Sequence, residues 1–187
     1  MSAPRIGFGK TFLLGTVFIA ATFGVYGMYR MFGGLERTPT QPSDRRELPD
    51  LEWNDLSGSA WKLADQKGRV VVVNYFATWC APCRREIPDL NDVAKEYTPR
   101  GVSFAAISLD TEQEMGQPVA PVLREFAVDN RLKIPVLLGR QPSSLTTVRS
   151  IPTTVLIDKH GRVAQVIVGQ FDAAALKRNL NVLLTEP

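Results

Sequence analysis

The sequence predicts an α/β domain built on a mixed β-sheet with helices on both faces, preceded by one transmembrane helix. Three observations predict this arrangement. A continuous run of β-branched and aromatic residues at 70–76 indicates a strand that is buried on both faces of a sheet. Strand-like and helix-like patterns alternate along the rest of the chain. Residues 11–29 carry no charged side chain.

Composition narrows the class of protein. The 187 residues are 44% hydrophobic and 22% charged, a balance typical of a folded chain and not of a disordered one. The net charge of +3 arises within residues 1–40, and the remaining residues contain as many basic as acidic side chains. We therefore expect no nucleic-acid partner. Two cysteines exclude a scaffold of several disulfides and, with a single histidine, a four-ligand zinc site, so we expect no metal.

Residues 1–10 are predicted to be a short N-terminal tail, and residues 11–30 a transmembrane anchor. At about 1.5 Å per residue, the uncharged stretch just spans a hydrocarbon layer of about 30 Å. It is longer than the apolar region of a typical signal peptide, and no A-x-A site follows it. An uncleaved anchor is therefore favoured over a cleaved signal peptide or a buried core helix. The flanking Lys and Arg residues do not settle its orientation.

Residues 31–48 contain Gly, Pro and polar residues without an apolar period, which predicts a linker that acts as a plain spacer. Residues 49–187 are predicted to form one domain. It begins with a β-hairpin, because residues 51–53 and 60–63 flank the turn sequence Asn-Asp-Leu-Ser-Gly.

The centre of the domain starts with the strand at 70–76. From 82 to 97, apolar positions recur at steps of three and four, which predicts a helix with one face inward. The later elements continue the alternation. They are strands at 102–109, 134–138, 153–157 and 163–168, and helices at 118–130, at 143–149 and, capped by Asp172, at the C-terminus.

The motif Trp79-Cys80-Ala81-Pro82-Cys83 lies between the buried strand and the first helix. Two such cysteines can form a disulfide when the second lies in the first helical turn. The free N–H groups and the dipole of that turn should lower the pKa of Cys80, making it the nucleophile and Cys83 the resolving thiol. Pro82 suits a first helical turn, and Ala81 and Pro82 influence the reduction potential. The alternative is a pair of buried thiols or half of a metal site.

Four stretches resemble the membrane-anchored TlpA/ResA-like thiol–disulfide oxidoreductases of the thioredoxin superfamily. They are residues 72–83, 84–88, 151–154, and 156–158 with Gly161. The family pattern W-C-x-P-C-x-x-E-x-P is present in full, and the resemblance covers residues 49–184. It implies a thioredoxin-like fold with an inserted helix at 118–130. It also implies a redox-active disulfide between Cys80 and Cys83, with no further cofactor.

The resemblance also implies roles for residues around the cysteines. The bond between Ile151 and Pro152 is expected to be cis, so that the backbone of Ile151 can pair with a substrate strand. The alternative is an ordinary trans proline that opens a strand. Trp79 is expected to cover the disulfide and to offer an apolar surface to partner proteins, unless it simply packs in the core.

Glu86 follows Cys83 by three residues, so helical spacing places it near the cysteine pair. A partly buried carboxylate there can accept the proton of the resolving thiol. The alternative is a solvated helix residue beside Arg84 and Arg85. Asn74 stands where thioredoxin has a buried aspartate and does not exchange a proton near neutral pH, so any proton relay must use Glu86 or water.

Two sets of polar residues are interpreted without a functional role. Asp110, Glu112 and Glu114 have the spacing of a metal-binding loop, but we interpret them as a solvated loop and helix start. His160 is the only histidine and lies in a predicted turn between strands. This counts against the copper chaperones that combine a cysteine pair with a distant histidine.

Together these features predict a protein-disulfide reductase held in the bacterial inner membrane by a single helix, with its domain facing the periplasm. Disulfides form in that compartment and must be undone there. The resemblance implies disulfide-bearing protein substrates in cytochrome c maturation or in copper-site assembly of respiratory oxidases. A membrane thiol-electron transporter would be the reductant. The alternatives are a disulfide-forming oxidant and a metallochaperone that holds Cu(I) between the thiolates.

Overall fold

The computed structural model describes residues 38–139, 148 and 150–187. The residues Pro39–Pro187 form one compact unit. The predicted tail, anchor and first part of the spacer lie outside the described residues, and so does nearly all of the helix predicted at 143–149. In the described part of the chain, no helix is long and apolar enough to cross a membrane.

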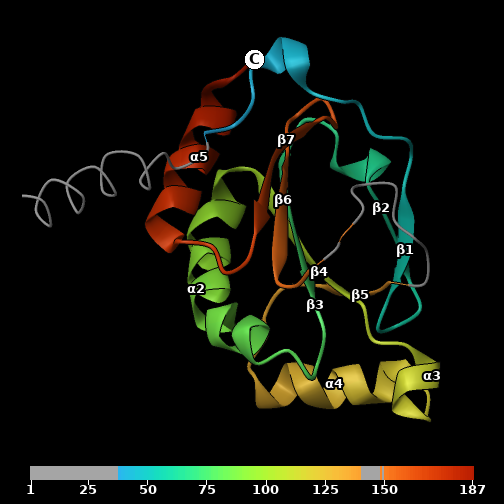
Figure 1. Cartoon of the computed structure of the whole chain (residues 1–187). Helices are drawn as coiled ribbons and strands as arrows, with labels where there is room; N and C mark the ends of the chain where they lie inside the picture. Colours follow the sequence, from blue (N-terminus) through green and yellow to red (C-terminus); the bar gives the residue numbers. More distant parts are fainter. Residues whose placement is uncertain (1–37, 140–147, 149) are drawn as a thin grey trace, which may run out of the picture. The chain divides into compact units, whose positions relative to one another are not determined.

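Seven strands form one mixed sheet in the order β2-β1-β5-β4-β3-β6-β7 (Figure 1). Strands β3, β4 and β5 are parallel, and each of the other pairs is antiparallel. The predicted hairpin and the predicted mixed sheet are thus confirmed. The strands are β1 (Glu52–Asp55), β2 (Ala60–Lys62), β3 (Val70–Phe76), β4 (Val102–Ser108), β5 (Val136–Leu138), β6 (Thr153–Ile157) and β7 (Val163–Val168).

Two long helices lie side by side along one face of the sheet, and α4 lies across the end of the sheet (Figure 1). The α-helices are α2 (Ala81–Tyr97), α3 (Glu112–Met115), α4 (Val119–Asp129) and α5 (Ala173–Thr185), and those on the face are α2 and α5. The 3-10 turns are η1 (Pro42–Asp44), η2 (Ala64–Gln66) and η3 (Thr98–Arg100). The helix expected at 118–130 is confirmed as α4.

Strand β3 shows why the apolar run at its centre is unbroken. Every one of its residues is buried, because successive side chains point to opposite faces of the sheet. Val70 and Val72 join the core under α2 and α5, whereas Val71 and Val73 join a second core on the other face. Among the described residues, this second core contains strand and loop residues but none from an α-helix. The expectation of helices on both faces is therefore confirmed for one face only.

The structure corrects the start of the domain. Residues 39–48, expected to be spacer, pack onto the fold: the N–H of Thr40 donates to the carbonyl of Ala164 at 2.8 Å. Arg45 is only 7% exposed and donates to Asp158 at 3.1 Å and to Glu186 at 2.7 Å. Composition could not reveal this, because the two carboxylates lie 113 and 141 residues further along the chain.

The two ends of the sheet carry different features. The cysteine motif follows the C-terminal end of β3, and Pro152 precedes the adjoining end of β6. Asp158 follows the other end of β6, where Ile157 pairs with Val71. The contacts of Arg45 therefore lie at the end of the sheet opposite to the cysteines.

Candidate active site

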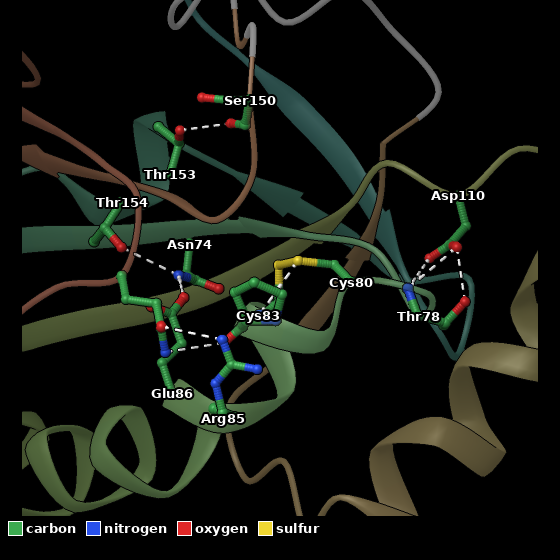
Figure 2. The surroundings of a disulfide bond; sticks show 12 residues. Asn74, Thr78, Cys80, Cys83, Arg85, Glu86, Asp110, Ser150, Thr153 and Thr154 are labelled. Atoms are coloured by element: carbon green, nitrogen blue, oxygen red, sulfur yellow. Dashed lines mark hydrogen bonds between the residues drawn. A yellow bond between two sulfur atoms is a disulfide. The ribbon is translucent and has the colours of Figure 1, made fainter.

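Cys80 and Cys83 form a disulfide at the start of α2, with 5.3 Å between their Cα atoms (Figure 2). Cys80 is the N-cap residue of α2, and its Sγ accepts a hydrogen bond from the N–H of Cys83 at 3.2 Å. Both side chains are buried. The structure thus brings the two cysteines together at the helix start, as the motif predicts.

The local chain order explains this placement. A turn over residues 77–80 joins β3 to α2 and is closed by the N–H of Cys80, which donates to the carbonyl of Ala77 at 3.1 Å. Ala81 and Pro82 begin α2, where the missing N–H of proline removes no helical hydrogen bond. The free N–H groups and the helix dipole favour a thiolate over a thiol on Cys80.

Glu86 is buried in the second turn of α2, with only 2% of its surface exposed. The alternative of a solvated helix residue is therefore wrong. Burial raises its pKa to about 7, although hydrogen bonds from the side chain of Asn74 and the backbone of Phe171 oppose this shift. Among the described residues, Oε2 of Glu86 has no hydrogen-bond partner of ordinary geometry. Such a carboxyl group can exchange a proton near neutral pH.

Asn74 orients this carboxyl group. Figure 2 shows its side chain between Glu86 and Thr154: Nδ2 donates to Oε1 of Glu86 at 2.8 Å and to Oγ1 of Thr154 at 3.1 Å. Asn74 and Thr154 are paired across β3 and β6. Sequence reasoning found that Asn74 carries no exchangeable proton but missed this contact. The available signal was an amide in the middle of an apolar strand, on the face that packs against α2.

Pro152 lies at the same end of the sheet as the disulfide. The peptide bond from Ile151 to Pro152 is cis, so the expectation from the resemblance is confirmed and the trans alternative is wrong. The carbonyl of Pro152 accepts from the N–H of Gly169 at 2.9 Å, and the side chain of Gln170 donates to the carbonyl of Pro82 at 3.2 Å. Residues 169–170 thus connect the proline segment to the start of α2.

Trp79 is 64% exposed, so the alternative that it packs in the core is wrong. Its ring presents apolar surface directly before Cys80. The contribution of Trp79, Ile151 and Pro152 to substrate binding stays a prediction.

Asp110 corrects another interpretation. Its side chain is buried, only 6% exposed, and accepts hydrogen bonds from Thr78 and Ser108, so it is no part of a solvated loop. The sequence offered one signal, a serine two residues before it at the end of a buried strand. In the described part of the chain, no three His, Cys, Asp or Glu side chains are grouped so that they could hold a metal ion. His160 is exposed in its turn, as predicted.

Comparison with known proteins assigns the family. Residues 45–166 match the family model described as AhpC/TSA family. The thiol-disulfide oxidoreductase ResA of Geobacillus kaustophilus is 36% identical over 134 residues, which cover 71% of this chain and 73% of the relative. The chain belongs to the AhpC/TSA family, among the ResA-like thiol–disulfide oxidoreductases.

Solved structures support the same assignment of this ResA-like chain. A putative thiol:disulfide interchange protein DsbE from Chlorobium tepidum has a TM-score of 0.64 and 28% identity, and covers 75% of this chain and 98% of its own. A secreted thiol-disulfide isomerase from Corynebacterium glutamicum has a TM-score of 0.67 and 26% identity. The match covers 82% of this chain and 94% of the isomerase. The names of these proteins share thiol–disulfide chemistry, and none of them states whether disulfides are formed or reduced.

Proposed function

We propose that this protein is a protein-disulfide reductase, anchored in the bacterial inner membrane by residues 11–30, with its domain in the periplasm. The observation that carries the proposal is the Cys80–Cys83 disulfide at the start of α2, with the buried carboxyl group of Glu86, whose pKa is raised to about 7, three residues after Cys83. A reductase must deprotonate its resolving thiol in every turnover. A carboxyl group with a pKa near the working pH is suited to that transfer.

The reaction proceeds in two exchanges. The thiolate of Cys80 attacks a substrate disulfide, forms a bond to one substrate sulfur and releases the other as a thiolate. Cys83 then transfers its proton to Glu86 and attacks Sγ of Cys80, which releases the second substrate thiolate and closes the disulfide. The substrate gains two electrons, and the cysteine pair loses two.

The proposed substrates are disulfides in apo-cytochrome c or in copper-site proteins of respiratory oxidases. The proposed reductant is a membrane thiol-electron transporter that returns the Cys80–Cys83 disulfide to the dithiol. The similarity to relatives named ResA and the uncharged segment at 11–29 support this assignment. The exposed ring of Trp79 beside Cys80 offers a contact for a polypeptide substrate.

Trapping of the mixed disulfide tests the proposal. The full chain with the substitution Cys83→Ser is reduced, purified in detergent and mixed with oxidised apo-cytochrome c. We expect a covalent adduct through Cys80 that dithiothreitol releases, because the resolving thiol is missing. The matched variant Cys80→Ser should form none. Absence of an adduct with Cys83→Ser, together with tight Cu(I) binding by the unmodified chain, would indicate a metallochaperone instead.

A further inference from the structure

Asp110 is a buried carboxylate that contacts the turn carrying the cysteine motif (Figure 2). Its two oxygens share the N–H of Thr78 at 3.2 and 3.0 Å, and Oδ1 also accepts from Oγ1 of Thr78 at 2.8 Å. Oδ2 accepts from Oγ of Ser108 at 2.7 Å. These donors are all uncharged. Both oxygens of Asp110 thus accept hydrogen bonds from Thr78, and Oδ2 accepts one more from Ser108.

Thr78 is one of the two central residues of the turn at 77–80, and Trp79 is the other. The turn ends at Cys80, which caps α2. Fixing both the backbone and the side chain of Thr78 therefore fixes the direction in which Trp79 projects. It also fixes the position from which Cys80 meets the first N–H groups of the helix.

The anchor for this turn is the sheet itself. Strand β4 runs parallel to β3, with Ser108 opposite Phe76, and the N–H of Leu109 donates to the carbonyl of Phe76 at 2.8 Å. Asp110 follows directly and is held from its other side, because its own N–H donates to Oγ of Ser108 at 3.0 Å. A carboxylate binds a backbone N–H more strongly than a neutral acceptor does, and its burial requires that its oxygens be satisfied.

We propose that Asp110 is a positioning residue for thiol–disulfide exchange. Through Thr78 it keeps the sulfur of Cys80 in line for attack on a disulfide and keeps Trp79 at the surface. The effect is on rate, since small displacements of a reacting atom cost large factors in rate. The proposal rests on exchange at Cys80, which is common to the family, and not on the reductase direction or the substrates proposed above.

The test uses the full chain in detergent with the substitution Asp110→Asn. The reduced protein is mixed with glutathione disulfide, and the second-order rate constant of the folded protein is measured. We expect the rate constant to fall about tenfold or more. Removal of a negative charge near the nucleophile lowers the pKa of its thiol, so at a pH below that pKa, where the rate constant is to be measured, the change in charge alone would raise the rate. The direction of the change therefore separates positioning from charge.

Asp158→Asn is the matched control. Asp158 is also buried, 2% exposed against 6% for Asp110, and accepts from the N–H groups of His160 and Arg162, but at the other end of the sheet. We expect it to lower the free energy of unfolding and to leave the exchange rate unchanged. The proposal is wrong if Asp110→Asn behaves in the same way, with lower stability and the rate of the unmodified protein.

A second variant, Thr78→Val, tests the positioning role of Asp110 if Asp110→Asn does not fold. Thr78→Val keeps the shape of the side chain and the backbone N–H but removes the O–H donor to Asp110. We expect a several-fold slower exchange with glutathione disulfide and a nearly unchanged unfolding midpoint. An exchange rate equal to that of the unmodified protein would overturn the proposal.

Discussion

At the scale of single residues, the pKa of Glu86 is set mainly by burial. Desolvation raises it, and the hydrogen bond from Asn74 opposes the shift without reversing it. A neutral amide can hold a carboxyl group in place without the strong stabilisation of its charge that a lysine or arginine would give. The Asn74 side chain therefore orients Glu86 and leaves its pKa at about 7.

This shift predicts how stability depends on pH. The pKa of Glu86 rises from 4.5 to about 7 on folding, so the folded state holds a proton that the unfolded state loses between these values. The disulfide form of the unmodified chain should therefore lose about 2–3 kcal/mol, relative to Glu86→Gln, as the pH rises from 4.5 to 7. Denaturant unfolding of both proteins across this range measures the difference.

The exposed residue Glu96 of the same helix supplies the control. Its side chain is 46% exposed, and the substitution Glu96→Gln should leave the pH dependence as it is in the unmodified chain. Parallel pH curves for the unmodified chain and Glu86→Gln would contradict the raised pKa.

The roles of site residues could be predicted from the sequence where the interacting residues lie close together along the chain. The two cysteines, Pro82 and Glu86 stand within one short motif, and helical spacing places them. Asp110 and Asn74 could not be placed in this way. Asp110 meets its partner Thr78 32 residues away, and Asn74 meets Thr154 80 residues away. These contacts depend on the pairing of β3 with β4 and β6, which the sequence pattern does not predict.

At the scale of elements, β3 and α2 follow from their own residues. The run of valines requires burial on two faces, and the apolar positions of α2 recur at helical period, so neither depends on a distant partner for its type. The segment at residues 39–48 is the opposite case. Its composition is that of a spacer, and its fixed position depends on Arg45, whose carboxylate partners are Asp158, directly after β6, and Glu186, near the C-terminus.

Loss of Arg45 should therefore destabilise the domain. We expect Arg45→Ala to lower the free energy of unfolding by about 3 kcal/mol, because it removes one of the two arginine partners of the buried Asp158 and also the partner of Glu186. Burial tends to raise the pKa of Asp158, but hydrogen bonds from Arg162 and Arg45 hold it below its usual range. The effect should be full at neutral pH and shrink as the pH falls below about 4.

Urea unfolding at pH 7 and pH 3 measures this effect. The exposed Arg69 provides the control, and Arg69→Ala should change stability by less than about 0.5 kcal/mol. Equal stabilities of Arg45→Ala and Arg69→Ala at pH 7 would show that residues 39–48 are a spacer after all.

At the scale of the whole molecule, the cysteine site and the contacts that fix residues 39–48 lie at opposite ends of the sheet. The disulfide, Pro152 and Trp79 lie at one end of the sheet, and the chain enters the domain through Arg45 at the other. The fold class and the inserted helix could be predicted, because they follow from the alternation of patterns and from the resemblance. The fixed position of residues 39–48 could not be predicted, since it depends on contacts of Arg45 with Asp158 and Glu186, which lie far along the chain.

The reduction potential of the Cys80–Cys83 pair tests the central claim, that this chain is a reductase. The full chain in detergent is equilibrated with mixtures of reduced and oxidised dithiothreitol, and free thiols are trapped by alkylation and counted. We predict a value near −270 mV, comparable with that of thioredoxin, at which the dithiol donates electrons to protein disulfides. A value near −120 mV, typical of a strong disulfide oxidant, would contradict the claim and make disulfide formation the function.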